Sequence, residues 1–364
     1  RNFDDASNLC NEIETSNSNL YKATIYRYKN EYEKAVELLK DAESHESFLE
    51  LGRNYFELRK FDESLMNVLK ATKLDSNNSE CFFWLGKIYL ATNDEVRSKK
   101  CFEKCLNQNP QNIECISILS AIYRKNKDWD NNLQILENSV KSVGDGSHQK
   151  TAFFQLGLHH LGQHNFDNAV TAFRNSLRYD AKNAECWEAL ADACLARGSY
   201  NSSLKVFEKS VELNPENTYA KLQIAKIKFV LQQYQESIAD YEQILSLNPD
   251  YLPALRGIVD SHFGRARYLN DNHRTGRARD HCQMTLAFIE TAIRIEPTFL
   301  CLWRLLGNVF DFIGSLPEEF NHLTVPAAII CEEKSKKLKG DELLELASKC
   351  YSRCLKLNKE NDFV

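Results

Sequence analysis

The amino-acid sequence predicts an all-α protein, a right-handed α-solenoid built from helix-turn-helix repeats. Apolar residues recur at i, i+3, i+4 and i+7 in one segment after another, which is the stripe of an amphipathic helix. Glycine and proline stand where the paired helices should end. A small residue opens every second helix, at successive steps of 34, 34, 37, 34 and 34 residues. These small residues are Ser64, Ser98, Asn132, Ala169, Ser203 and Ser237.

The segment 184–217 shows the repeat most clearly. Gly198 supplies the left-handed residue that ends its first helix, and Pro215 ends the unit. One helix hairpin of this size cannot bury its own apolar face, so it needs copies of itself on either side. The order of residues resembles the tetratricopeptide pattern, whose period is about 34 residues. The apolar residues are Trp187, Leu190, Ala191 and Cys194 in the first helix, and Leu204, Phe207 and Val211 in the second.

Two further slots recur in the same register. A leucine followed by glycine or alanine lies in the first helix, and an aromatic residue lies in the second. Small residues are needed where two helices cross closely, and large ones where the gap widens. The pairs are Leu51-Gly52, Leu85-Gly86, Leu156-Gly157, Leu190-Ala191 and Leu306-Gly307, and the aromatic residues are Phe102, Phe173, Phe207 and Tyr241.

Taken in order, the chain divides into three parts. Residues 1–149 hold the first part of the array, with a partial second helix at 1–15 and units at 16–44, 45–78, 79–112 and 113–149. Residues 150–251 hold the regular units 150–183, 184–217 and 218–251. Residues 252–364 hold two units with long insertions, 252–299 and 300–359. The chain begins inside one helix and stops where another should begin, so we expect it to be a segment of a longer protein.

One connection in the first part is loose. Gly144-Asp145-Gly146-Ser147 follows the least regular unit, 113–149. The glycines predict either a slightly long turn or a kink between two sub-arrays.

Both insertions, at about 265–283 and 314–341, are expected to form loops on one face of the array, where loops often carry function. The first could contact RNA phosphates, because it is rich in arginine. The alternative is a solvated extension of a helix. Its arginines are Arg265, Arg267, Arg274, Arg277 and Arg279. The second insertion holds a basic run made of Lys334, Lys336, Lys337 and Lys339.

The composition limits the classes of function. The chain is 43% hydrophobic and 27% charged, which is typical of a folded soluble protein and too apolar for a disordered one. A net charge of −5 gives no global reason to expect nucleic-acid binding. No apolar run approaches the ~18 residues needed to span a membrane. No membrane association is therefore predicted.

The twelve cysteines fall mainly in repeat slots, where they would act as small buried hydrophobic residues. Cys101 and Cys105 form an i, i+4 pair, as do Cys350 and Cys354, but no second pair lies at zinc-ligand spacing. We therefore predict neither a metal site nor another cofactor. Free thiols indicate a reducing compartment, the cytoplasm, with the nucleus as an alternative.

The sequence contains none of the motifs that would indicate catalysis. It has no Gly-x4-Gly-Lys-Ser/Thr loop, no His-Glu-x2-His pair and no Gly-x-Ser-x-Gly elbow. A non-catalytic interaction protein is the first reading. The second is a substrate- or peptide-recruiting array that serves another assembly, or an enzyme domain outside these residues.

Successive first helices should line one inner face of the array, which predicts a groove for an extended or helical peptide. Aromatic side chains would anchor the peptide, and a few charges would fix its register. The alternative is that these phenylalanines and leucines fill gaps between neighbouring hairpins. The candidate groove residues are Phe83, Lys87, Phe154, Gln155, Leu158, Glu188, Asp192, Leu222, Lys226 and Phe229.

The order of regular, short-insert and long-insert units resembles that of a known scaffold. Segment 184–217, Asp250-Tyr251-Leu252-Pro253-Ala254-Leu255-Arg256-Gly257 and the unit opening Leu300-Cys301-Leu302-Trp303 are similar to the tetratricopeptide scaffold subunits of Ski (superkiller) complexes. The similarity continues in Glu342-Leu343-Leu344 and in Cys350-Tyr351-Ser352-Arg353-Cys354. It covers about 150–360 well, and the earlier part only through the generic repeat.

The resemblance implies a long cytoplasmic scaffold. In that family it holds a DExH-box RNA helicase and two β-propeller (WD-repeat) subunits, which deliver RNA 3′ ends to the exosome. The family's subunit contacts lie largely on a distal C-terminal arm, which we do not expect within these 364 residues. The resemblance therefore assigns no binding residues here.

Overall fold

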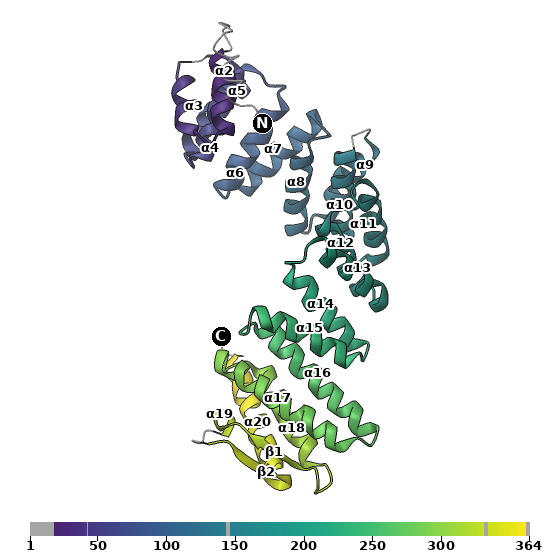
Figure 1. The fold of residues 1–364 in the computed structure, drawn as a ribbon. Coiled ribbons are helices and arrows are strands. Elements are labelled where there is room, and N and C mark those ends of the chain that lie inside the picture. The colour runs from purple at the N-terminus through teal and green to yellow at the C-terminus, as the bar shows by residue number, and fades with distance from the viewer. Residues whose placement is uncertain (1–17, 42, 143–145, 331–333, 362–364) are drawn as a thin grey trace. The chain divides into compact units, whose positions relative to one another are not determined.

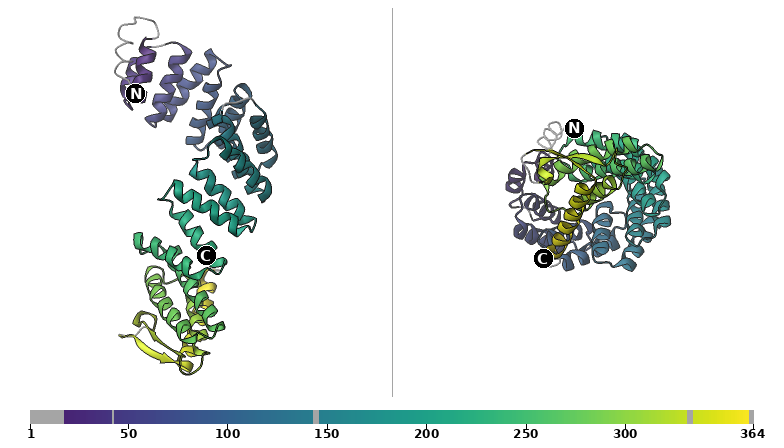
Figure 2. Two further views of the ribbon diagram at one scale, coloured as in Figure 1. Left: turned by 45° about the vertical axis from the view of Figure 1, so that its right-hand side comes forward. Right: turned by 90° about the horizontal axis from the view of Figure 1, so that it is seen from below.

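The computed structural model describes residues 18–361 except 42, 143–145 and 331–333. The partial helix predicted at 1–15 lies outside the described residues, and so does most of the loose connection predicted around Asp145. The chain falls into two compact units, one ending at Lys182 and the other beginning at Asn183. In each unit consecutive helices pair as antiparallel hairpins, and each hairpin packs on the next (Figure 1, Figure 2).

The first unit contains helices α2 to α11, two to a repeat. Their bounds are α2 (Ser18–Tyr28), α3 (Tyr32–Leu38), α4 (His45–Glu57), α5 (Phe61–Leu74), α6 (Ser79–Ala91), α7 (Glu95–Gln108), α8 (Ile113–Lys125), α9 (Trp129–Lys141), α10 (Gly146–Gly162) and α11 (Phe166–Tyr179).

The second unit begins with two regular repeats and continues with two irregular ones. Its elements are α12 (Ala184–Ala196), α13 (Tyr200–Leu213), α14 (Thr218–Val230), α15 (Tyr234–Leu247), α16 (Leu252–Asp271), α17 (Thr275–Ile295), α18 (Leu300–Gly314), β1 (His322–Val325), α19 (Ala327–Ile330), β2 (Lys336–Lys339) and α20 (Gly340–Asn361). The all-α prediction is confirmed for the array, and the two short strands lie inside the second insertion.

Short polar side chains begin the first helices. Asn78, Asn112, Asn183 and Asn217 precede α6, α8, α12 and α14, and each side chain accepts a hydrogen bond of 2.9 to 3.0 Å from a backbone N–H of the first turn. Asparagine is a preferred residue at this position because its side chain satisfies an N–H group that has no partner within the helix.

A left-handed residue ends the first helices. Gly198 has φ +81°, as its sequence position predicted. In other repeats the same slot holds a residue with a side chain, at a cost of about 1–2 kcal/mol each. The hairpin thus imposes this backbone conformation even where no glycine stands. The other described residues in this slot are Asn30, Arg59, Asn93, Lys127, His164, Gln232 and His273, with φ between 56° and 61°.

Most of the small residues that open the second helices also form a hydrogen bond to the first helix of their repeat. In four repeats this residue is a fully buried serine whose hydroxyl donates a 2.7 to 2.9 Å hydrogen bond to the first-helix carbonyl twelve positions earlier. Each bond fixes the crossing of the two helices in one repeat. The serines are Ser64, Ser98, Ser203 and Ser237.

The Leu-Gly slot faces the large residue of its own second helix. A Cβ atom placed on Gly86 would lie 2.6 Å from the ring of Phe102, and one placed on Gly157 would lie 2.5 Å from the ring of Phe173. Both rings are fully buried. The prediction that small residues mark close helix crossings is therefore confirmed at these positions.

The first insertion is not a loop, and that prediction was wrong. Its residues lengthen two helices instead, so α16 has 20 residues and α17 has 21, with a turn of three residues between them. The apolar side chains of Ala266, Leu269, Ala278 and Cys282 are buried between the extended helices, which explains why the added residues are helical.

The second insertion forms a two-stranded antiparallel sheet. His322 pairs with Lys339, and Val325 pairs with Lys336. The alternate residues Leu323, Val325 and Leu338 are buried in the core of the last two repeats. A strand pair this small needs such packing, because an isolated hairpin is at best marginally stable in water.

Candidate protein-binding pocket in the second unit

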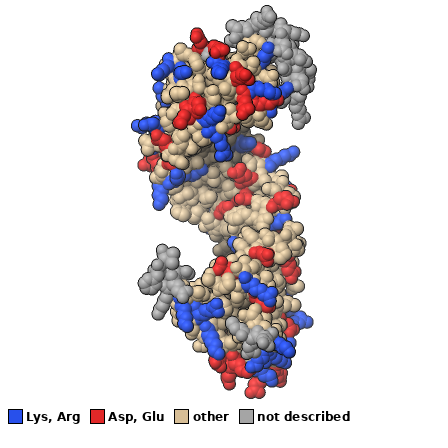
Figure 3. All heavy atoms as spheres, turned by 90° about the vertical axis from the view of Figure 1, so that its left-hand side faces the viewer, with Lys and Arg blue, Asp and Glu red and all other residues tan. Residues whose placement is uncertain are grey.

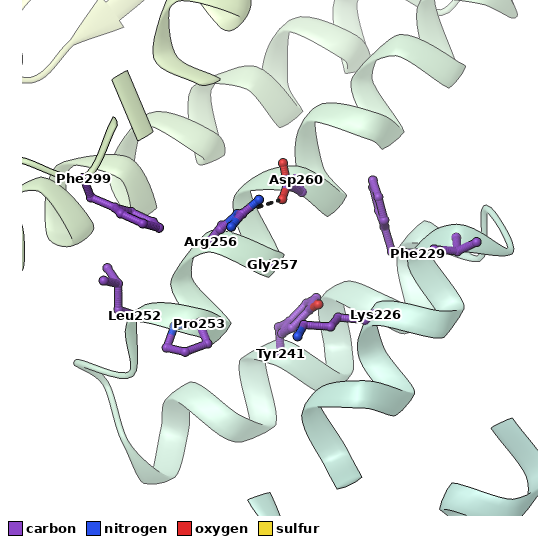
Figure 4. Close-up of a pocket in the computed structure, with 10 residues that line it drawn as sticks. Lys226, Phe229, Tyr241, Leu252, Pro253, Arg256, Gly257, Asp260 and Phe299 are labelled. Carbon is purple, nitrogen blue, oxygen red and sulfur yellow. Dashed lines mark ion pairs between the residues drawn. The ribbon is translucent and has the colours of Figure 1, made fainter. Parts of the chain in front are cut away.

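A pocket of about 470 Å³ opens on the first-helix face of the second unit. Helices α14 and α16 form its sides, and Phe299, which caps α18, closes one end (Figure 4). Its lining residues are Lys226, Phe229, Val230, Tyr241, Leu252, Pro253, Arg256, Gly257, Asp260 and Phe299.

The floor of the pocket is the ring of Tyr241 from α15. The ring lies directly against the backbone of α16, since a Cβ atom on Gly257 would fall 2.2 Å from Tyr241 Cζ. Tyr241 is 1% exposed, and burial raises the pKa of its hydroxyl well above the ordinary range. The floor is therefore rigid and uncharged.

The apolar walls lie on both sides of this floor. Phe229 and Phe299 stand on opposite sides in Figure 4, and Val230 is half exposed at the edge. The ring of Phe229 packs edge-on against Tyr234, with 5.8 Å between centroids. These contacts hold an aromatic side chain at the pocket without covering it.

Positive charge predominates around the pocket. Lys226 is exposed, and Arg256 lies 3.8 Å from Asp260, its partner one turn along α16 (Figure 4). Burial raises the pKa of the Asp260 carboxyl, and the guanidinium groups of Arg256 and Arg304 oppose that shift in part. Two cations, Arg256 and Arg304, thus act on the Asp260 carboxyl, and Lys226 lines the same pocket. None of the lining residues is a histidine, serine or cysteine, so the lining offers binding groups and no nucleophile–base pair.

Two of the predicted groove residues, Lys226 and Phe229, line this pocket. Three others lie in the interior: Phe83, Gln155 and Leu222 are 6%, 7% and 4% exposed. The structure does not place these three on an open face, and we no longer count them among ligand-binding groups. Phe83 and Leu222 belong to hydrophobic clusters of the core, as the alternative reading expected, and Gln155 accepts a hydrogen bond of 2.8 Å from Arg124.

Three of the predicted charged groove residues, Lys87, Glu188 and Asp192, link successive repeats. Lys87 Nζ donates to Glu114 at 3.0 Å and lies 4.6 Å above the ring of Trp84. The hydroxyl of Tyr219 donates to Asp192 at 2.9 Å, and Asn217 donates to Glu188. These groups already have partners within the array.

The other two predicted groove residues are half-buried. Phe154 packs on Phe173 with 5.8 Å between ring centroids, so its ring supports its own repeat. Leu158 lies in the same helix, α10, and is also half-buried.

Sequence reasoning missed Arg256, Asp260, Tyr241 and Phe299. A signal was available, because residues 253, 256, 257 and 260 follow the spacing of one helix face. The insertion obscured it by making the unit appear irregular.

The arginines of the first insertion do not act as one group. Arg265 donates to Gln235 Oε1 at 2.9 Å, and Arg279 pairs with Asp280 at 2.7 Å. Arg267, Arg274 and Arg277 are exposed.

The described part of the chain contains neither a cluster of metal ligands nor a membrane-spanning helix. It holds no group of three or more histidine, cysteine or acidic side chains placed to bind a metal ion. No helix there is long and apolar enough to cross a lipid bilayer.

The hairpins, their helix crossings and the pocket between first helices together define a tetratricopeptide-repeat solenoid. Family models described as "Tetratricopeptide repeat" match residues 79–112, 154–218 and 219–251. The chain therefore contains tetratricopeptide repeats.

Its resemblance to the Ski complex scaffold is also confirmed. It is 31% identical to superkiller complex protein 3 of Mus musculus over 90% of this chain, and 30% identical to that of Homo sapiens over 98%. It is 30% identical to tetratricopeptide repeat protein 37 of Xenopus laevis over 84%. The chain spans 21%, 24% and 20% of these relatives, less than a quarter of each.

Solved structures show the fold alone. A C-terminal part of a TPR repeat-containing protein from Cytophaga hutchinsonii gives a TM-score of 0.53 at 16% identity, and the match covers 65% of this chain and 98% of that one. The Cut9–Hcn1 hetero-tetramer of APC/C gives 0.50 at 13% identity, covering 71% of this chain and 52% of that one.

Proposed function

We propose that this chain is a segment of a Ski-type scaffold that supports an RNA helicase and β-propeller subunits in cytoplasmic, exosome-mediated 3′–5′ mRNA decay. The observation that supports this most is the extent of the similarity. An alignment that covers 98% of the chain takes in both insertions, whose order sets this array apart from a generic repeat protein. The role is to hold other proteins, so the scaffold carries out no chemistry itself.

The pocket in the second unit is the docking point that we propose for one partner segment. The occupant is an extended segment that places an aromatic or aliphatic side chain between Phe229 and Phe299 and acidic side chains beside Lys226 and Arg256. Charge complementarity favours this chemistry, because two cations, Lys226 and Arg256, line the pocket beside one partly exposed carboxylate, Asp260. A side chain buried at the centre would supply most of the affinity.

The second candidate, an array that serves an enzyme domain elsewhere in its protein, has less support. A relative named protein O-mannosyl-transferase TMTC1, from Homo sapiens, is 23% identical over 47% of this chain. That alignment is too short to take in the whole array.

The position of Pro253 provides a sharp test of the pocket. Arg53, Lys87 and Asp192 each bond to the residue 27 positions later, at the start of the next first helix. Lys226 occupies the same slot, and the residue 27 positions after it is Pro253. Pro253→Glu should give Lys226 an ion-pair partner on the next first helix, and the added side chain should fill the pocket. An acidic residue in the first turn of α16 also suits the helix dipole, so the fold should be retained.

The experiment is affinity purification of the intact protein from cytoplasm, with mass spectrometry of what co-purifies. The wild type and Lys205→Glu, an exposed control on α13, should both retain an RNA helicase and propeller subunits. Lys226→Glu and Pro253→Glu should lose one of these partners. Absence of any helicase from the wild-type eluate would refute the Ski-type role. Full retention by both pocket variants would refute the pocket assignment and leave the scaffold role standing.

A further inference from the structure

The two insertions, although they belong to different repeats, form one surface. The guanidinium of Arg279 on α17 lies 3.1 Å from the ring nitrogen Nε2 of His322 on β1. Gln283 bonds the backbone of Thr324 twice: its amide donates to the carbonyl at 2.8 Å, and its oxygen accepts from the N–H at 2.9 Å. The side chain of Gln283 thus acts like a neighbouring strand and docks β1 along the extended part of α17.

This surface is positively charged on its open face. The register places His322 opposite Lys339 and Thr324 opposite Lys337, so their side chains share the face away from the buried leucine and valine residues. Both lysines are exposed. The pKa of His322 is lowered by burial and then by Lys337, Arg279 and Lys339, so these cations lie close enough to act on one another. Lys and Arg side chains gather over the lower part of the molecule in Figure 3, above acidic groups at its tip.

Two carboxylates in the described part of the chain lie beside this face: Asp280 pairs with Arg279, and Glu342 accepts a hydrogen bond from the backbone N–H of Lys339 at 3.1 Å. Lys337 and Lys339 have no ion-pair partner there, and Arg279 shares its charge with the exposed Asp280. Lysine on an edge strand can serve to prevent edge-to-edge association. That role explains the lysines of β2, but it does not require an arginine and a histidine from two other elements beside them.

We propose that the face formed by Arg279, His322, Thr324, Lys337 and Lys339 binds the phosphate backbone of RNA. Phosphate contacts need only cations and hydrogen-bond donors on an open surface. A protein partner would need an apolar pocket for a side-chain anchor, and the apolar residues of this sheet are buried on its other face. The proposal goes beyond the scaffold function and does not rest on it. The proposal also replaces part of the prediction that the arginines of the first insertion contact RNA. Only one of those five arginines, Arg279, belongs to this face.

The test is fluorescence anisotropy of a fluorescein-labelled 20-nucleotide oligouridylate titrated with the 364-residue chain, in KCl from 50 to 200 mM. The wild type should bind with an affinity that falls steeply with salt. Lys337→Ala/Lys339→Ala should reduce the slope of log K against log [KCl] by about 1.4, since each phosphate contact to a single strand contributes about 0.7. Arg274→Ala/Arg277→Ala removes the same charge elsewhere on the first insertion and should leave the slope unchanged.

Three results would overturn the proposal: no binding of RNA by the wild type, an unchanged slope in the lysine variant, or an equal loss in the arginine variant. A second probe, fluorescein-labelled poly-L-glutamate, separates RNA from an acidic protein. Lysine-dependent binding of polyglutamate with no binding of RNA would also overturn it. Circular dichroism of Lys337→Gln/Lys339→Gln, which keeps polar side chains on the edge strand, controls for loss of the fold.

Discussion

The crossing of α10 and α11 permits a quantitative prediction at Gly157. A Cβ atom there would lie 2.5 Å from the ring of Phe173, closer than the 3.0 Å below which real Cβ contacts essentially never occur. The ring is fully buried and has no room to move away, so a side chain at position 157 would push the two helices apart. We expect Gly157→Ala to lower the free energy of unfolding by about 1 kcal/mol and Gly157→Leu by about 3 kcal/mol, the range found for overpacking. In another repeat Ala191 packs in the same core cluster as Phe207. An alanine therefore fits this slot where the two helices are spaced to accept it.

The measurement is hydrogen exchange of the amides of α10 and α11, because an array need not unfold in a single step. About 1 kcal/mol corresponds to a roughly fivefold loss of protection, and about 3 kcal/mol to a roughly 150-fold loss. Phe173→Leu in the Gly157→Ala background should recover part of the loss, as a double-mutant cycle would show. Glu212→Leu, on the exposed side of α13, is the control and should cost little. Equal protection in Gly157→Leu and Glu212→Leu would refute the assignment of this slot to a close crossing.

Three further predictions concern buried polar groups. Ser203→Ala removes the hydroxyl that donates to the first-helix carbonyl and should destabilise its repeat by about 1 kcal/mol, measured by exchange in α12 and α13. His262 has its pKa lowered from 6.5 to about 4, mainly by burial, so the unfolded state binds the proton first. The free energy of unfolding should therefore be highest above pH 6.5 and fall by up to about 3 kcal/mol as the pH drops towards 4. In denaturant titrations, His262→Asn should make the free energy of unfolding depend less on pH. Glu50, 2% exposed, accepts from both Arg27 and Arg53. Glu50→Ala should cost about 3 kcal/mol, since it leaves Arg27 without its carboxylate partner and Arg53 with Glu80 alone, and protection of α4 reports the loss.

Each of these predictions has an outcome that contradicts it. Unchanged protection in Ser203→Ala would show that the hydroxyl contributes nothing beyond its small size. An unaltered acid transition in His262→Asn would assign the pH dependence to other groups. If Glu50→Leu, which removes the same carboxylate, were as stable as the wild type, the charge cluster would not hold α4 to its neighbours.

The repeat could be predicted from the sequence because its slots are set by local packing. The positions of Ser203 and Ser237 were found by their spacing and small size. Their hydrogen bonds to the preceding helix were not, because Ala169 fills the same slot and hides the role of the hydroxyl. Spacing therefore locates a helix crossing, but the chemistry of the contact requires the partner atom twelve positions earlier.

The strands of the second insertion could not be predicted. Four-residue runs such as His322–Val325 are too short to give a periodic signal. Their pairing depends on burial of Leu323 and Leu338 and on docking by Gln283, which lies in a different repeat. The same holds for the helical form of the first insertion, since the burial of Leu269 between extended helices appears only when both helices are present.

The candidate site was only partly predictable, and the reason lies in a regularity between repeats. A polar residue near the middle of a first helix bonds to the residue 27 positions later in the next first helix, as Lys87 does with Glu114. Sequence reasoning treated such residues as free groove charges, because a contact between repeats cannot be read from one repeat alone. Where the second residue of the pair is proline, as at Pro253, the side chain of Lys226 has no such partner and the space beside it stays open. Pro253→Glu would place an acidic side chain beside Lys226, and we expect this substitution to close part of the pocket.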